Sequence, residues 1–96
     1  MKSIEVKTKA KEEFIDITHF IKEEIASSRI KNGTCLIFVP HTTAGVTINE
    51  NADPSVKADL LMALRRLIPD SLPFEHSEGN SPAHIKASLV GSSVHL

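Results

Sequence analysis

The pattern of apolar positions changes from strand-like to helix-like within the first third of the chain. Apolar and charged residues alternate over residues 3–9, and this period of two predicts a strand with one buried face. Phe20, Ile21 and Ile25 then share one helical face, opposite a run of charged side chains. They predict an amphipathic helix that ends at Asn32–Gly33, because both of these residues adopt positive φ readily.

Two β-rich runs follow, separated by small and polar residues. Residues 34–39 are mostly apolar at consecutive positions, which predicts a central strand with both faces covered. Residues 46–50 predict a second, shorter strand. Because Gly45 suits a turn or a bulge between the two runs, we expect a hairpin with His41 near its tip.

The second half of the chain contains two helix-start signals, in each of which a capping residue precedes a proline. Asp53–Pro54 is the first and Ser81–Pro82 is the second. Apolar residues at helical spacing follow both signals. The predicted elements are a helix to about residue 68, a loop over residues 69–80, a helix over residues 82–90, and a strand that begins at residue 92.

This order of elements predicts an α+β fold, with helices packed on one face of a mainly antiparallel sheet. With 96 residues, we expect a single domain over residues 1–96. The net charge is −1 with the histidines neutral, so we expect no nucleic-acid partner, which would need clustered basic residues. No apolar run is long enough to span a bilayer, and one cysteine forms no internal disulfide. We therefore expect a cytoplasmic protein with no membrane partner.

Three of the five histidines lie among small polar residues rather than among apolar ones: His41, His76 and His84. Imidazole titrates near neutral pH and is the commonest metal ligand. Nearby acids, amides and hydroxyls would complete a polar site with these histidines, and the candidates are Thr42, Glu50, Asn51, Ser77, Glu78, Asn80 and Lys86.

The spacing of the three histidines leaves three interpretations open. They form one open metal site for a divalent ion such as zinc or magnesium. Alternatively, His84 lies in the first turn of its helix, where it binds a phosphate together with Ser77, Asn80 and Ser81. Lys86 adds charge to this site if it points the same way. In the third interpretation each histidine only makes hydrogen bonds within its own loop or helix.

Two segments resemble the YjbQ-like family: residues 40–54, from Pro40 through the Asp-Pro pair, and residues 76–93, which contain His-Ser-Glu-Gly-Asn and Ala-His-Ile-Lys-Ala-Ser. With the helix between them, the resemblance covers most of residues 35–94. It implies a small α+β protein that assembles as a homotrimer, with sites at or near subunit boundaries. It also implies a secondary thiamine-phosphate synthase, which joins a pyrimidine pyrophosphate to a thiazole phosphate and releases pyrophosphate.

The residue pattern and the resemblance together give candidate roles to the polar residues. The catalytic candidates are His41, Glu50, His76 and His84, the three histidines being also the metal candidates. The ligand-binding candidates are Thr42, Asn51, Ser77, Glu78, Asn80 and Lys86, and the expected ligand is a phosphorylated small molecule. Two alternatives remain: a non-enzymatic trimeric module that binds a metal ion or a phosphorylated metabolite, and a metal-dependent hydrolase with Glu50 or Glu78 as base.

The chain differs from the family pattern near its C-terminus. Family members continue with further strands, among them a Gly-Thr-Trp-Gln type segment, whereas this chain contains no tryptophan. We therefore expect a C-terminally truncated form of the domain with an open sheet edge, which favours aggregation. We expect a longer form to be more soluble and more resistant to urea.

Overall fold

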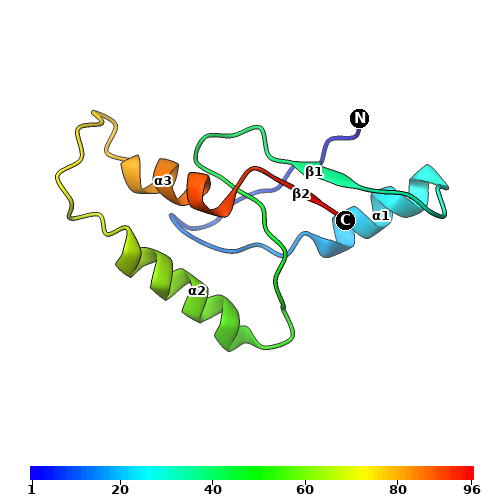
Figure 1. Ribbon diagram of the computed structural model, residues 1–96, viewed down its shortest axis with the longest axis horizontal. Coiled ribbons are helices and arrows are strands. Elements are labelled where there is room, and N and C mark those ends of the chain that lie inside the picture. Colours follow the sequence, from blue (N-terminus) through cyan, green and yellow to red (C-terminus); the bar gives the residue numbers. More distant parts are fainter.

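The computed structural model describes residues 1–96, which form three helices and one pair of strands (Figure 1). This composition confirms the predicted α+β class. The elements are α1 (Thr18–Ser28), β1 (Leu36–Phe38), α2 (Pro54–Leu67), α3 (Ser81–Val90) and β2 (Ser93–His95). None of the helices combines the length and apolar character that crossing a membrane requires.

The sheet joins the middle of the chain to its last residues. β1 and β2 are antiparallel, and Ile37 pairs with Val94 at the centre of the ladder. Backbone hydrogen bonds extend the pairing on both sides, because Cys35 and Leu96 exchange two bonds and the Val39 N–H donates to the Ser92 carbonyl over 2.8 Å. The strand predicted near residue 92 is confirmed, and its pairing brings the α3–β2 turn beside residues 39–41.

The predicted hairpin between residues 34–39 and 46–50 is wrong. Residues 46–50 form no strand, because the chain turns toward α3 at this point and the Val46 N–H donates to the Gly91 carbonyl over 2.9 Å. The predicted central strand is also shorter than expected and is not covered on both faces, since Leu36 is 60% exposed and Phe38 is 58% exposed. The partner of β1 is β2, which no local pattern identifies.

Residues 3–9 do not form the predicted strand. The alternating pattern is present, but these residues make no backbone–backbone hydrogen bond. A strand requires a hydrogen-bonded neighbour, so the pattern is insufficient by itself.

The helices start close to the predicted residues, and one of them ends early. In α2 the Asp53 carboxylate accepts the Ser55 N–H over 2.9 Å, which is the predicted N-cap. α1 ends at Ser28 rather than at Asn32–Gly33. The Ser28 hydroxyl donates to the Ile25 carbonyl and accepts the Ile30 N–H, and such side-chain bonds to the backbone compete with a continuing helix.

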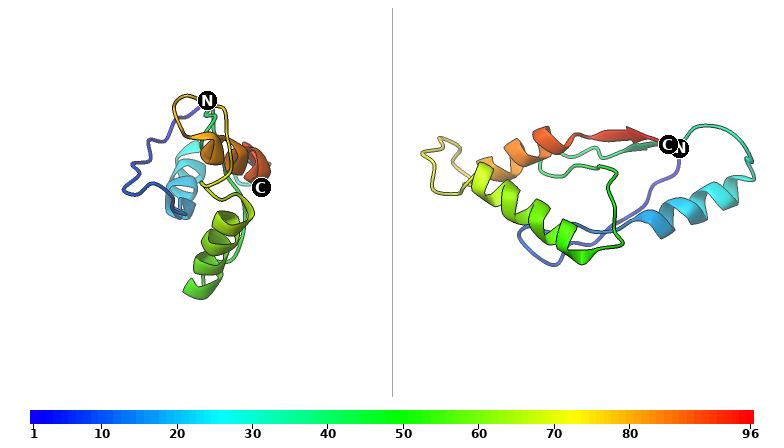
Figure 2. Two further views of the ribbon diagram at one scale, coloured as in Figure 1. Left: turned by 90° about the vertical axis from the view of Figure 1, so that its left-hand side faces the viewer. Right: turned by 60° about the horizontal axis from the view of Figure 1, so that its bottom comes forward.

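The molecule is elongated, with dimensions of about 50 × 30 × 22 Å. α2 and α3 lie at one end, joined by a loop, and α1 lies at the other end (Figures 1 and 2). Extensive contact between elements is confined to β1 and β2, and only Val46 and Pro82 are buried. The fold therefore places the polar candidates along an open surface.

Charged side chains link the N-terminal segment to the two later helices. The Glu12 carboxylate accepts hydrogen bonds from Lys86 Nζ over 3.0 Å and from Arg65 Nε over 3.3 Å. Lys11 pairs in the same way with Asp70 over 3.1 Å. Glu12 therefore connects three parts of the chain: the N-terminal segment, α2 and α3.

Candidate functional site

The segment that contains His41 is fixed against the end of α3 by a close backbone approach. A Cβ atom added to Gly45 would lie 2.6 Å from the Gly91 carbonyl oxygen and 3.0 Å from Val90 Cγ1. These distances are too short for any side chain, so only glycine permits this approach. The hydrogen bonds of Val39 and Val46 to the α3–β2 turn hold the segment on both sides of His41.

This approach forms a hollow of about 380 Å³ between the segment and α3. His84 and Ser88 lie one turn apart and therefore share a face of α3. The hollow is lined by His41, Thr42, Ala44, His84, Ala87, Ser88, Gly91 and Ser92. We call it the phosphate hollow, after the phosphorylated ligand that is expected from the sequence. Two of the three predicted histidines thus line one cavity, although a long stretch of sequence separates them.

The hydrogen bonds of His41 determine which ring nitrogen is available to a ligand. Its Nδ1 accepts the Thr43 N–H over 3.1 Å. A neutral imidazole has one N–H, so Nε2 bears the proton and is a donor. A donor at Nε2 suits an oxyanion. Histidines that bind a metal usually donate their second ring N–H to an acceptor, whereas the second nitrogen of His41 is itself an acceptor.

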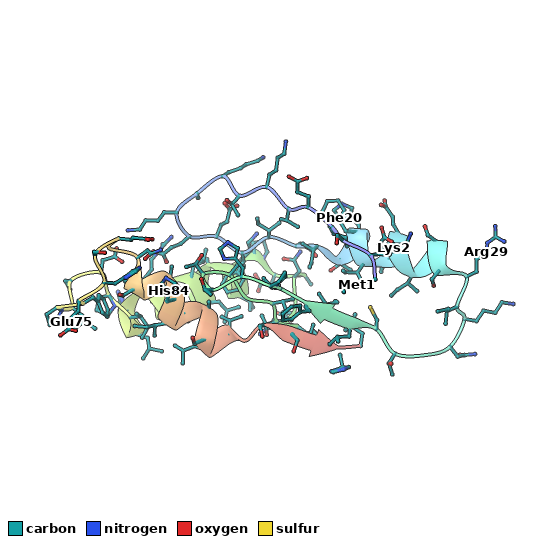
Figure 3. The ribbon with its side chains drawn as sticks, turned by 90° about the horizontal axis from the view of Figure 1, so that it is seen from above. Met1, Lys2, Phe20, Arg29, Glu75 and His84 are labelled. Atoms are coloured by element: carbon teal, nitrogen blue, oxygen red, sulfur yellow. The ribbon has the colours of Figure 1, made fainter.

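His76 and Glu78 lie next to His84, in the loop that precedes α3. The rings of His76 and His84 meet edge to face with their centroids 5.4 Å apart. His76 Nε2 lies 3.8 Å from a Glu78 carboxylate oxygen. Figure 3 shows His84 on α3, near the loop that contains Glu75. His84 is therefore the common neighbour of His41 and His76.

The start of α3 offers fewer free donors than expected for a phosphate site. The Asn80 carbonyl accepts the N–H groups of both Ala83 and His84, and Pro82 has no N–H. Among these first positions only the Ser81 N–H has no partner in the chain. The Asn80 side-chain oxygen is buried and has no hydrogen-bond partner.

Of the six predicted ligand residues only Thr42 lines the phosphate hollow. The residues outside it are Asn51, Ser77, Glu78, Asn80 and Lys86, together with the catalytic candidates Glu50 and His76. Lys86 is paired with Glu12, and its side chain is only 14% exposed. Asn51 donates to an Asp16 carboxylate oxygen over 2.8 Å, and Glu50 is exposed on the same segment. Ser77 is exposed in the loop before α3. Lys86 therefore does not add charge beside His84 as expected, because its ammonium group pairs with Glu12 of the N-terminal segment.

The histidines do not fit the expected metal site within one chain. No three histidine, cysteine, aspartate or glutamate side chains are placed to hold one ion. The orientation of His41 agrees with this result, since its free nitrogen is a donor.

Sequence analysis did not select Ser88 and Ser92 as ligand residues, although both line the hollow. The helical period relates Ser88 to His84, so that residue was accessible from the pattern. Ser92 reaches the hollow only through the pairing of β1 with β2, which is a long-range feature.

The family model and the similar proteins all point to one family. Residues 2–96 match the family described as "UPF0047 protein YjbQ-like". UPF0047 protein MJ1081 of Methanocaldococcus jannaschii is 57% identical over 89 residues, which are 93% of this chain and 64% of that protein. UPF0047 protein YugU of Bacillus subtilis is 44% identical over 97 residues, which are 100% of this chain and 74% of that protein.

Solved structures show the same similarity. A YjbQ/UPF0047 family protein of Clostridium acetobutylicum has a TM-score of 0.92 and 49% identity, covering 95% of this chain and 70% of that one. A YbjQ-like protein of unknown function from Sulfolobus solfataricus has a TM-score of 0.88 and 33% identity, covering 94% and 66%. The chain thus spans about two thirds of the length of these relatives. From residue 2 to residue 96, the chain belongs to the YjbQ-like UPF0047 family.

Proposed function

We propose that the chain binds a phosphorylated small molecule in the phosphate hollow and contributes to a transferase of the thiamine-phosphate synthase type. The observation that supports this proposal is that His41 and His84 line one hollow together with three hydroxyl side chains. Imidazole N–H groups and the hydroxyls of Thr42 and Ser92 are donors to phosphate oxygens, whereas the Ser88 hydroxyl donates to the His84 carbonyl over 3.0 Å. No carboxylate lines the hollow, so nothing in it repels an anion.

The proposed reaction needs these donors at the leaving group. A bond forms between a ring nitrogen of the thiazole phosphate and the carbon that held the pyrophosphate. The carbon–oxygen bond breaks, and its electron pair leaves on the pyrophosphate. In this proposal His41 Nε2–H and the His84 ring, which both line the hollow, donate to the developing negative charge. The bond changes require no proton transfer, so Glu50 need not act as a base.

Within this proposal His76 is a positioning residue. Its ring packs against the edge of His84, and it lies near the Glu78 carboxylate. These contacts restrict the orientation of the His84 ring. Asn80 lies at the helix start, outside the lining of the hollow, and its unpartnered side-chain oxygen is an acceptor, which does not bind a phosphate oxygen.

A binding module without catalysis is the second candidate, because the same hollow would hold a phosphorylated metabolite with no second substrate. The two candidates differ only in turnover. Formation of thiamine phosphate from both substrates supports the transferase, and binding of either substrate without product supports the module.

Calorimetric titration with pyrophosphate tests the proposed site. We expect wild-type protein to bind pyrophosphate, and His84→Ala and His41→Ala to bind at least tenfold more weakly, since each substitution removes a donor. His19→Ala is the matched control, because His19 is exposed on α1. Equal affinity in wild type and His84→Ala would contradict the proposal. Addition of zinc or magnesium tests the alternative metal ligand, which predicts metal binding that both substitutions abolish.

A further inference from the structure

The segment between α1 and β1 contains a motif that the fold leaves unused, the pair Asn32–Gly33. The sequence predicts this pair as the end of a helix, but α1 ends at Ser28. Residues 31–34 neither donate nor accept a backbone–backbone hydrogen bond, and both residues of the pair are exposed. Figures 1 and 3 show the segment beyond Arg29, at the end of the molecule opposite α2 and α3. The backbone of the pair is therefore not held by any other element.

The Gly33 nitrogen is accessible to the side chain of Asn32. An asparagine side chain can react with the backbone nitrogen of the next residue, and the attack closes a five-membered ring within one chain, so no second molecule has to be captured. A side chain on the next residue hinders this attack, and glycine has none. A Cβ atom added to Gly33 would meet only Ile30 Cγ2, at 3.5 Å. The surrounding fold therefore does not shield the Gly33 nitrogen.

The other three asparagines, Asn49, Asn51 and Asn80, are each followed by a residue with a side chain. Two of them are also restrained by the fold. The Asn51 amide donates to an Asp16 carboxylate oxygen over 2.8 Å. The Asn80 side-chain oxygen is buried, and the Asn80 carbonyl accepts two N–H groups in the first turn of α3. Asn32 alone combines an exposed side chain, a following glycine and a backbone without hydrogen bonds.

We propose that Asn32 is a site of spontaneous deamidation in the folded protein. The Gly33 nitrogen attacks Asn32 Cγ, and a carbon–nitrogen bond forms. The bond between Cγ and Nδ2 breaks, and the side-chain nitrogen leaves as ammonia with the proton of the Gly33 N–H. Water then opens the resulting succinimide ring at one of its two carbonyl groups. Opening at the side-chain carbonyl gives aspartate, and opening at the main-chain carbonyl gives isoaspartate.

The fold accommodates both products. Each product adds a negative charge, and isoaspartate also lengthens the main chain by a methylene group. The two ends of the segment are held, because the Arg29 N–H donates to the Ala26 carbonyl over 3.2 Å and Cys35 exchanges two hydrogen bonds with Leu96. The residues between these ends make no backbone–backbone hydrogen bond that the extra length would break. The pairing of β1 with β2 is therefore retained after the reaction.

The test follows deamidation of the whole folded chain in mildly alkaline buffer, by mass spectrometry of its proteolytic peptides. We expect Asn32 to be converted at least about tenfold faster than Asn49, Asn51 or Asn80, because only its attacking nitrogen belongs to a glycine. Enzymatic methylation that is specific for isoaspartate should label residue 32. A parallel sample unfolded in guanidinium chloride should convert Asn32 at nearly the same rate, because the fold does not protect it.

Gly33→Ala is the matched control, because it places a methyl group beside the attacking nitrogen and makes no close contact with the rest of the chain. We expect this variant to slow the conversion of Asn32 by about tenfold or more and to leave the rate at Asn51 unchanged. An unchanged rate at Asn51 also shows that the variant retains the contact between Asn51 and Asp16.

Three outcomes would overturn the inference. In the first, Asn32 is converted no faster than the other asparagines of the folded chain. In the second, unfolding accelerates the conversion of Asn32 by about tenfold or more, which shows that the fold shields a nitrogen with no side chain beside it. In the third, residue 32 becomes aspartate with no isoaspartate, which shows direct hydrolysis of the amide instead of attack by the Gly33 nitrogen.

Discussion

Gly45 is the residue on which the position of His41 depends most directly. Any side chain at residue 45 would collide with the Gly91 carbonyl oxygen, at 2.6 Å from an added Cβ. We expect Gly45→Ala to lower the free energy of unfolding by about 1–3 kcal/mol, because the two backbones must separate to accept the methyl group. The urea midpoint measures this loss, and the affinity for pyrophosphate should fall with it as His41 moves from α3.

Gly33→Ala is the matched control for this prediction. An added Cβ at Gly33 would meet only Ile30 Cγ2, at an ordinary 3.5 Å, and no positive φ is required there. We expect Gly33→Ala to raise the free energy of unfolding by up to about 1 kcal/mol, because alanine restricts the unfolded chain more than glycine does. Similar urea midpoints for Gly45→Ala and Gly33→Ala would show that the close approach at Gly45 does not hold the segment.

Individual site residues could be predicted where the residues next to them in the sequence are enough to indicate a polar site. His41 and His84 stand among small polar residues, and the structure places both on one hollow. The contact of His84 with His76 follows the same signal. Gly45 and Ser92 were not predictable as site-forming residues, because their roles depend on backbone contacts between distant parts of the chain.

At the scale of elements, Glu12 connects α3 and α2 to the N-terminal segment. The hydrogen bond from Lys86 holds the pKa of the Glu12 carboxyl below its ordinary value of 4.5, and the charge of Arg65 acts in the same direction. The carboxylate form is therefore favoured in the folded state. We expect Glu12→Gln to lower the free energy of unfolding by only about 1 kcal/mol at neutral pH, because partly exposed ion pairs contribute little to stability.

The destabilisation caused by Glu12→Gln should become smaller as the pH falls. A carboxyl group whose pKa is lower in the folded state stabilises the fold above its unfolded pKa, and this contribution is lost as the pH falls through the folded pKa. The urea midpoints of wild type and Glu12→Gln should therefore differ at pH 7 and converge in acid, below pH 4.5. Glu23→Gln is the control, because Glu23 is exposed on α1. A difference that persists unchanged in acid would rule out the ion pairs as its cause.

Helices were predictable and strand pairing was not, for a physical reason. The start of α2 depends on Asp53 and Pro54, which act within one turn of the chain. β1 depends on β2, more than fifty residues further along the sequence. Residues 3–9 have the alternating pattern of a strand but no hydrogen-bonded neighbour. Local patterns determine which segments favour a strand, whereas the pairing depends on the rest of the fold.

At the scale of the whole molecule, the chain exposes more surface than a compact protein of its size. Its accessible area is 7825 Å², whereas a folded monomer of 10.5 kDa is expected to expose about 5,400 Å². The excess is larger than the roughly 800 Å² that one partner buries in a typical stable interface. Large apolar side chains are exposed on separate elements, among them Leu36 on β1, Leu67 on α2 and Leu89 on α3.

The family resemblance implies a homotrimer, in which neighbouring subunits would cover part of this exposed apolar surface. When association is coupled to folding, the unfolding equilibrium depends on protein concentration, because dilution favours the separate unfolded chains. We therefore expect the urea midpoint to rise over a hundredfold increase in concentration, and sedimentation velocity to show a species of three times the chain mass. A monomer of concentration-independent midpoint would contradict the trimer. In that case the single chain is stable with its apolar side chains exposed to solvent. The phosphate hollow is then complete within one subunit.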